Sequence, residues 1–263
     1  MNRTTPPPIR AGRINRTLLA AALLAAGSLS GCASTPTGPL GQPSHPSDPL
    51  ESYNRAMTDF NDDLDQALLK PVATLYRDVT PQPLRAGVGN FFGNLSDAWS
   101  FVNNALQLRG REALDSLVRF NLNTVFGLGG LLDIASEAGI SRHKQDFGLT
   151  LGYWGVPTGP YLVLPLLGPS SLRDTAALPA DFWGDGLRQV RPIALRNSLA
   201  GLRIVDKRAD LLRAEAVLDS IAFDSYILTR DVYLSLRTND DSPLARRRRA
   251  QTDDDAGQLP DDY

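Results

Sequence analysis

The sequence is poor in the residue types that build most catalytic and metal sites. It has one cysteine, Cys32, and two histidines among 263 residues, so an intrachain disulfide is excluded. His45 and His143 have no second ligand nearby in the sequence, which leaves a metal site without support. No Gly-x-Ser-x-Gly nucleophile motif is present, and the acidic run Asp62–Asp65 lacks the glycine and terminal glutamate of a calcium loop. We therefore expect no catalytic residue, no metal and no cofactor.

A long apolar run and a basic surface are also missing. The apolar stretch Leu18–Ala26 has nine residues, whereas a transmembrane helix needs about 20. The net charge of −2 includes four arginines in the first sixteen residues, so a chain without them carries −6. An acidic chain of this kind does not suit nucleic-acid binding.

The N-terminus has the features of a secretory signal peptide. Four arginines precede the apolar stretch, and small residues follow it. Leu29-Ser30-Gly31-Cys32 resembles the lipobox of bacterial lipoproteins, in which the cysteine is acylated with fatty-acid chains such as palmitate and the chain is cut before it. The alternative is an ordinary signal peptide with a chance cysteine. Ala33 stands where retained inner-membrane lipoproteins often have Asp, so this resemblance implies the outer membrane, with the protein lipid-anchored on the periplasmic side.

Composition divides the chain into four parts. We expect a signal peptide over 1–31 and a lipidated cysteine with a Pro- and Ser-rich tether over 32–47. A folded domain follows over 48–238, and a disordered polar tail over 239–263. The tail contains Arg246–Arg249, which we interpret as solvated, with contact to anionic headgroups as the alternative.

Apolar spacing predicts helices through most of the folded part. One helix, capped by Asp48, should run to about Lys70, and a short one should pass through Leu75 and end before Thr80. Further helices are expected from Ser96, from Glu112 to about Phe126, and from Val205 to about Leu236 with one break near residues 219–225. Gly87–Gly93 is interpreted as a loose turn, and residues 161–164 as extended. The fold class is mostly α, in a single domain.

Three glycines stand together in an apolar setting. Gly127, Gly129 and Gly130 lie between Val125-Phe126 and Leu131-Leu132. An interior glycine costs a helix about 0.5–1 kcal/mol relative to alanine, so a hinge or a tight hairpin is expected here. The aromatic residues are interleaved with Gly, Pro and Asn, as in proteins of the membrane interface, although an ordinary helical core with exposed aromatics remains an alternative.

Several motifs resemble the VacJ/MlaA family of outer-membrane lipoproteins, which serve the maintenance of lipid asymmetry. The resemblance covers about 48–238. Its residues, with x for any residue, are Asp48-Pro49-Leu50-Glu51, Asn54-Arg55-x-Met57, Phe60-Asn61, Arg77-Asp78-x-x-Pro81-Gln82-Pro83, Asn90-Phe91-x-Gly93-Asn94-Leu95, Arg119-Phe120-x-Leu122-Asn123-Thr124-x-x-Gly127-x-Gly129-Gly130-x-x-Asp133, Asp146-Phe147-Gly148-x-Thr150-Leu151-Gly152, Gly159-Pro160-Tyr161, Leu164-Pro165-x-x-Gly168-x-Ser170-x-x-Arg173-Asp174 and Arg230-Asp231-x-Tyr233.

The resemblance implies a flat ring of amphipathic helices around a channel, embedded in a membrane. It implies removal of mislocalised phospholipid from the outer leaflet, with an outer-membrane porin trimer and a periplasmic lipid carrier protein as partners. A porin-associated scaffold that transports nothing, and a lipid hydrolase or acyltransferase, remain the alternatives.

Candidate site residues follow from the same resemblance. We expect lipid or channel contacts from Phe60, Trp99, Asn103, Asn104, Gln107 and Phe126. The polar members of this set would give a phospholipid headgroup a wet side, and the apolar members would contact its acyl chains. Gly127, Gly129 and Gly130 would form a hinge that sets how open the path is.

Overall fold

The computed structural model describes residues 45–221 and 224–237, which are predominantly helical. The signal peptide, Cys32, residues up to 44 and the tail from 238 lie outside the described residues. In chain order the elements are α2 (Glu51–Leu64), the π-helix η2 (Asp65–Leu69), α3 (Lys70–Val79), α4 (Gln82–Leu106), α5 (Gly110–Val125), α6 (Ile134–Glu137), α7 (Phe147–Tyr153), β1 (Tyr161–Leu164), β2 (Gly168–Ser171), α8 (Leu172–Gly184), the 3₁₀ helix η3 (Gly186–Gln189), α9 (Ile193–Ile221) and α10 (Ser225–Arg237).

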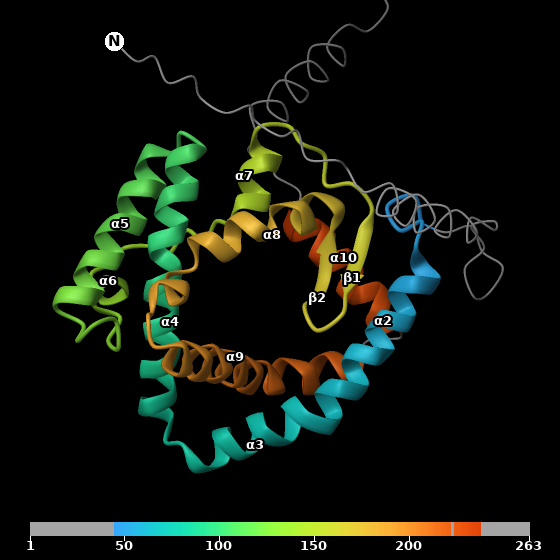
Figure 1. Ribbon diagram of the computed structural model, residues 1–263, viewed down its shortest axis with the longest axis horizontal. Coiled ribbons are helices and arrows are strands. Elements are labelled where there is room, and N and C mark those ends of the chain that lie inside the picture. Colours follow the sequence, from blue (N-terminus) through green and yellow to red (C-terminus); the bar gives the residue numbers. More distant parts are fainter. Residues whose placement is uncertain (1–44, 222–223, 238–263) are drawn as a thin grey trace, which may run out of the picture. The chain divides into compact units, whose positions relative to one another are not determined.

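Within the unit His45–Tyr263, the helices follow one another around a ring (Figure 1). α3 packs along α9, α4 pairs with α5, and α7 packs on α8. β1 and β2 form an antiparallel hairpin beside α2, with Tyr161 opposite Ser171. The mostly α fold class is confirmed. Along the described residues, we find no helix with the length and apolarity needed to cross a membrane.

The first helix differs from the prediction at both ends. Asp48 does not cap it, since α2 begins at Glu51 with Leu50 at the N-cap and no side-chain cap bond. The helix also does not stop near Lys70. It widens into η2, and α3 continues to Val79. Pro71 is the second residue of α3 and directly follows η2, so the wider π-turn lies where the proline offers no backbone N–H to the helix.

α4 starts far earlier than the predicted cap at Ser96. It begins at Gln82 after Pro81, so Ser96 and the buried Asp97 are interior positions, and Gly87–Gly93 is helix rather than a turn. Gly93 serves close packing instead, because a Cβ there would lie 2.7 Å from the guanidinium Nη1 of Arg142.

Two further predicted elements are confirmed, and a third is confirmed in part. α5 runs over Gly110–Val125, close to its expected bounds, and residues 161–164 form β1. The last long helix begins earlier than expected, at Ile193, and its predicted break falls between Ile221 and Ser225.

Candidate functional site

The amphipathicity of α5 is inverted relative to a helix of a water-soluble protein. Its buried face carries Ser116, Arg119 and Asn123, spaced by three and four residues. Leu114 and Val118, by contrast, are 60% and 41% exposed. Buried polar groups and exposed large apolar groups are the informative departures from a globular pattern, and here both occur on one helix.

The same inversion extends to α2 and α4. On α2 the buried residue is Asn54, whereas α3 exposes large apolar side chains but buries Ala73 in a small apolar cluster with Ala209 and Leu212. α4 buries a stripe of polar residues. The exposed apolar residues on α2, η2, α3 and α5 include Tyr53, Phe60, Leu68, Val72, Leu75, Val79, Leu114, Val118 and Val125; we call these the perimeter apolar residues. Stripes of this kind mark a surface that contacts lipid or another protein.

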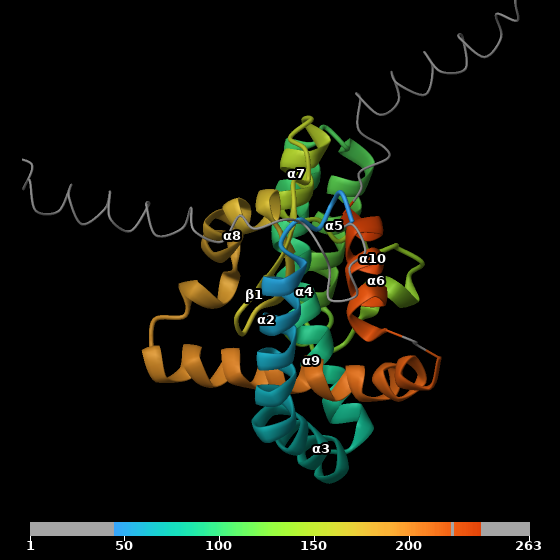
Figure 2. The same cartoon turned by 90° about the vertical axis from the view of Figure 1, so that its right-hand side faces the viewer.

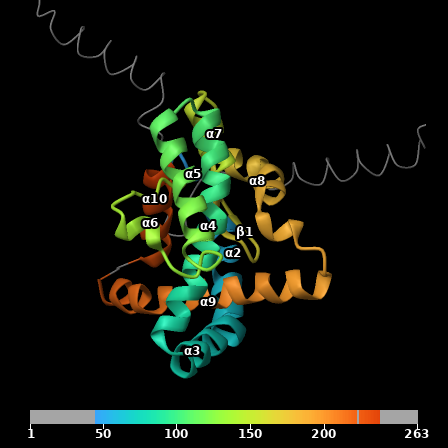
Figure 3. The same cartoon turned by 90° about the vertical axis from the view of Figure 1, so that its left-hand side faces the viewer.

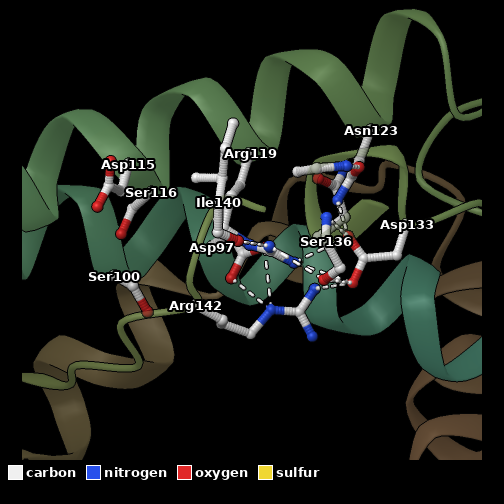
Figure 4. A network of polar contacts seen from close by, with 12 residues as sticks. Asp97, Ser100, Asp115, Ser116, Arg119, Asn123, Asp133, Ser136, Ile140 and Arg142 are labelled. Atoms are coloured by element: carbon white, nitrogen blue, oxygen red, sulfur yellow. Dashed lines mark hydrogen bonds and ion pairs between the residues drawn. The ribbon is translucent and has the colours of Figure 1, made fainter. Parts of the chain in front are cut away.

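A buried ionic network joins α4, α5 and the segment after them (Figure 4). Arg119 is 1% exposed, and its guanidinium donates to Asp97 Oδ2 at 3.3 Å and to both Asp133 carboxylate oxygens at 2.8 and 2.9 Å. Arg142 pairs with Asp97 at 3.0 Å. Arg119 Nη1 also donates to the carbonyl of Ile140. Two arginines thus face two carboxylates, which compensates the charges that burial removes from water.

The carboxylates of this network have opposite pKa shifts. Burial raises the pKa of Asp97 against the opposing charges of Arg142 and Arg119. Burial also acts to raise the pKa of Asp133, but hydrogen bonds from Ser136 and Asn123 and the charge of Arg119 lower it to about 2. Asp133 therefore stays ionised at neutral pH and anchors the chain directly after the glycine turn.

The predicted polar channel residues lie in the interior. Asn103, Asn104 and Gln107 are fully buried. Asn103 accepts from Thr150 Oγ1 at 2.8 Å, and Gln107 Nε2 donates to the same hydroxyl at 3.0 Å. These three side chains join α4 to α7 and to the segment before it, and a contact with a lipid path stays a prediction for them.

The aromatic candidates occupy two environments. Trp99 is half-buried, and its indole Nε1 donates to Asp181 on α8 at 2.8 Å. Phe60 on α2 and Phe126 at the end of α5 are 48% and 67% exposed. Contact with lipid stays a prediction for Phe60 and Phe126, whereas Trp99 packs between helices.

The three glycines form a tight turn whose two ends are held. Leu128, Gly129 and Gly130 all have positive φ, at 55°, 74° and 97°. A Cβ on Gly127 would come within 2.3 Å of the Leu132 carbonyl oxygen, and one on Gly130 within 2.7 Å of Asn94 Nδ2. A Cβ on Gly129 would meet nothing within 4 Å. Because only Gly129 is free of contacts, it is the position at which a hinge can be tested.

We expect Gly129→Ala to leave abundance nearly normal and to alter lipid handling. The φ of Gly129 is positive, which costs a residue with a Cβ about 1–2 kcal/mol; alanine therefore shifts the turn away from its observed conformation without causing a clash. Outer-leaflet phospholipid and detergent sensitivity measure the effect. Gly201→Ala, at an open position on α9, is the control. If Gly129→Ala had normal abundance and unchanged lipid asymmetry, residues 127–130 would be a plain turn with no role as a hinge.

Sequence reasoning missed a second buried cluster, at the start of the domain. The Asp48 carboxylate is fully buried and accepts from Asn54 Nδ2 at 2.8 Å and from the Tyr226 hydroxyl at 2.5 Å. Arg230 lies 3.3 Å from it. The cluster ties the first described residues to α2 and α10. In the sequence, the cluster is signalled only by Asp48 and Arg230, which stand in the first and the last of the family-like motifs. Because they lie at opposite ends of the domain, sequence spacing could not show that they meet.

Comparison with known sequences finds one family along the described domain. The family model described as MlaA lipoprotein matches residues 46–240. A relative from Escherichia coli (strain K12), the intermembrane phospholipid transport system lipoprotein MlaA, is 38% identical over 221 residues, covering 82% of this chain and 85% of the relative. The protein of the same name from Haemophilus influenzae is 34% identical over 233 residues, covering 83% and 89%.

A solved structure gives the same result for the fold. It comes from work on the structural basis for maintenance of bacterial outer membrane lipid asymmetry, and it matches with a TM-score of 0.64 at 37% identity. The match covers 73% of this chain and 98% of the other. The chain belongs to the MlaA lipoprotein family.

Proposed function

We propose that this protein is an outer-membrane lipoprotein that removes mislocalised phospholipid from the outer leaflet and passes it to a periplasmic carrier. Cys32 carries the anchor, the signal peptide ends at Gly31, and an outer-membrane porin trimer holds the helical domain in place. Relatives named for intermembrane phospholipid transport support the proposal, as does the matching structure from work on outer-membrane lipid asymmetry.

The observation that carries the proposal is the inverted burial of the perimeter helices. Transfer of an exposed apolar side chain from water to lipid is favourable by a free energy of about 25 cal/mol per Å² of its surface. Most polar groups on the inner faces have hydrogen-bond partners within the protein, although the buried oxygens Asn94 Oδ1, Asn104 Oδ1 and Gln107 Oε1 have none among the described residues. A domain with this distribution is suited to lie within one leaflet, since a helix in the interface has one face in lipid and one away from it.

Phospholipid transfer explains why a ring is useful. Exposing one chain of about 16 carbons to water costs about 12 kcal/mol, and an unpaired phosphate in hydrocarbon costs at least several kcal/mol. A lipid therefore needs a path with one polar and one apolar side. We place that path through the ring of helices, with the turn Gly127–Gly130 as the element that sets its opening.

No covalent step is part of this function. Relatives named as lipoproteins of a phospholipid transport system support a role without an enzymatic step. A lipid hydrolase would release fatty acid or lysolipid, whereas a transporter returns the lipid intact.

Phe60→Asp should disturb lipid handling more than folding. Because Phe60 is 48% exposed, the substitution removes little internal packing, and surface changes usually stay within about 0.5 kcal/mol. A charge in the lipid-facing surface costs about 2.5–3.5 kcal/mol at hydrocarbon depth. Membrane abundance and outer-leaflet phospholipid are the readouts.

Ser52→Asp is the matched control for this prediction, since it adds the same charge at an exposed polar position of α2. It should behave as the wild type. If Phe60→Asp instead disappeared from cells and lost its thermal transition in detergent, Phe60 would be an ordinary core residue.

Reconstitution tests the proposal directly. The acylated protein with its porin is placed in vesicles containing labelled phospholipid, and the carrier is added outside. We expect intact labelled lipid on the carrier only when the protein is present. Labelled fatty acid or lysolipid would indicate a hydrolase, and absence of transfer despite stable porin binding would indicate a scaffold.

A further inference from the structure

An arginine-rich segment joins α8 to α9. Arg188 lies in η3, Arg191 in the connection, and Arg196 in the first turn of α9, all within nine residues. Arg188 and Arg191 are exposed, and Arg196 is partly so. Of the three side chains, none forms an ion pair or hydrogen bond with another described residue. Most arginines of the ring are paired with carboxylates, so this local excess of positive charge is unusual for the molecule.

Large apolar side chains stand among these arginines. Trp183, near the end of α8, is 81% exposed, and its neighbour Phe182 is 45% exposed. Ile193 and Leu195, between Arg191 and Arg196, are also exposed. Tryptophan next to arginine is typical of the membrane–water interface, where the ring lies at headgroup level and the guanidinium reaches the polar layer.

The segment is a fixed projection. In Figures 2 and 3 the end of α8, η3 and the start of α9 extend beyond the other described elements on one face of the ring. The backbone at Gly184 lies against the Trp99 ring, where a Cβ would come within 2.2 Å of a ring carbon. Leu187 is buried, and Arg203 pairs with Asp185 at 2.6 Å. These contacts hold the backbone of the segment in place against α4 and α9.

We propose that Phe182–Arg196, which we call the α8–α9 projection, is an interfacial anchor that binds the headgroup layer of anionic phospholipids. Its apolar side chains enter the boundary of the acyl chains, and Arg188, Arg191 and Arg196 bind phosphodiester oxygens. Guanidinium groups suit this task because they donate two parallel hydrogen bonds to one phosphate.

The charge balance identifies the lipid class. Zwitterionic phospholipids offer phosphate but no net field, whereas an anionic leaflet attracts each nearby arginine and strengthens binding about fivefold per residue. Three arginines without a carboxylate partner therefore favour an anionic surface by about a hundredfold. This inference rests on the proposed function, which places the domain in a lipid leaflet. It adds that the α8–α9 projection selects anionic phospholipids.

A fluorescent thiol probe tests the inference in the full acylated protein. Because Cys32 is the single cysteine and carries the acyl group, Gln189→Cys supplies the free thiol for an environment-sensitive label, and the parent protein should take up none. Acrylamide quenching is measured in vesicles of phosphatidylcholine alone and with added phosphatidylglycerol. We expect the label to become protected as phosphatidylglycerol is added, and the protection to weaken with salt.

Two triple variants separate the effect of these three arginines from the effect of the protein's net charge. Arg188→Gln/Arg191→Gln/Arg196→Gln should lose the preference for phosphatidylglycerol by about a hundredfold. Arg111→Gln/Lys207→Gln/Arg213→Gln removes the same amount of charge at exposed positions elsewhere. This variant should keep the preference for phosphatidylglycerol. An equal loss in both variants, or equal protection in the two lipid mixtures, would overturn the inference.

A second label distinguishes this inference from the proposed function. Leu75→Cys reports on the perimeter apolar residues and should be protected in both lipid mixtures. Protection at residue 75 without a phosphatidylglycerol response at residue 189 would overturn the α8–α9 projection alone. Exposure of both labels in both mixtures would overturn the lipid placement as well.

Discussion

Replacing Arg119 by methionine should lower the free energy of unfolding by about 3–5 kcal/mol. Arg119 and Asp97 are both 1% exposed. Without Arg119, Arg142 alone faces the carboxylates of Asp97 and Asp133, so one negative charge of the network is left uncompensated. Methionine keeps much of the side-chain volume, so the loss reports charge and hydrogen bonds rather than a cavity. Chemical unfolding in detergent, followed by helical circular dichroism, measures it.

Arg77→Met is the matched control, because Arg77 pairs with Asp78 at 3.0 Å but the two side chains are 35% and 58% exposed. Exposed pairs contribute at most about 1 kcal/mol. In addition, Asp97→Asn should restore part of the stability lost in Arg119→Met, since it leaves one carboxylate, that of Asp133, for the one remaining arginine, Arg142. Equal small losses for Arg119→Met and Arg77→Met would show that the buried network does not stabilise the ring.

The substitution Cys32→Ala should abolish acylation completely. The sequence contains no other cysteine, so no second thiol can accept the diacylglycerol. Labelling cells with radioactive palmitate measures this, and the precursor should accumulate uncut. Ser34→Ala, two residues downstream, is the control and should be labelled normally. Undiminished label on Cys32→Ala would contradict the anchor.

The sequence predicted the helices whose apolar residues recur regularly, and it missed the start of α4. Gly87 and Gly93 suggested a turn, yet both lie within the helix. Their role depends on distant residues, because Gly93 faces Arg142 and a Cβ at Gly87 would contact Leu131 at 3.6 Å. Close packing and chain reversal both favour glycine, and sequence alone does not separate them.

Apolar periodicity also does not say which side of a helix faces the protein. The spacing of Leu114 and Val118 on α5 would equally suit a buried core stripe. In the structure that face is exposed, and Arg119 and Asn123 are inside. For the same reason Asn103 and Gln107 looked like solvent-facing residues, although they join helices in the interior.

The most direct test of the central claim is the phospholipid content of the outer leaflet in cells lacking this protein. Surface phospholipid is labelled in the deletion strain and in strains complemented with the wild type, Phe60→Asp or Ser52→Asp. Phospholipid transport predicts accumulation in the deletion strain and in the Phe60→Asp strain, with normal levels in the other two. Normal surface asymmetry in the deletion strain, with porin assembly disturbed, would contradict transport and leave a scaffold.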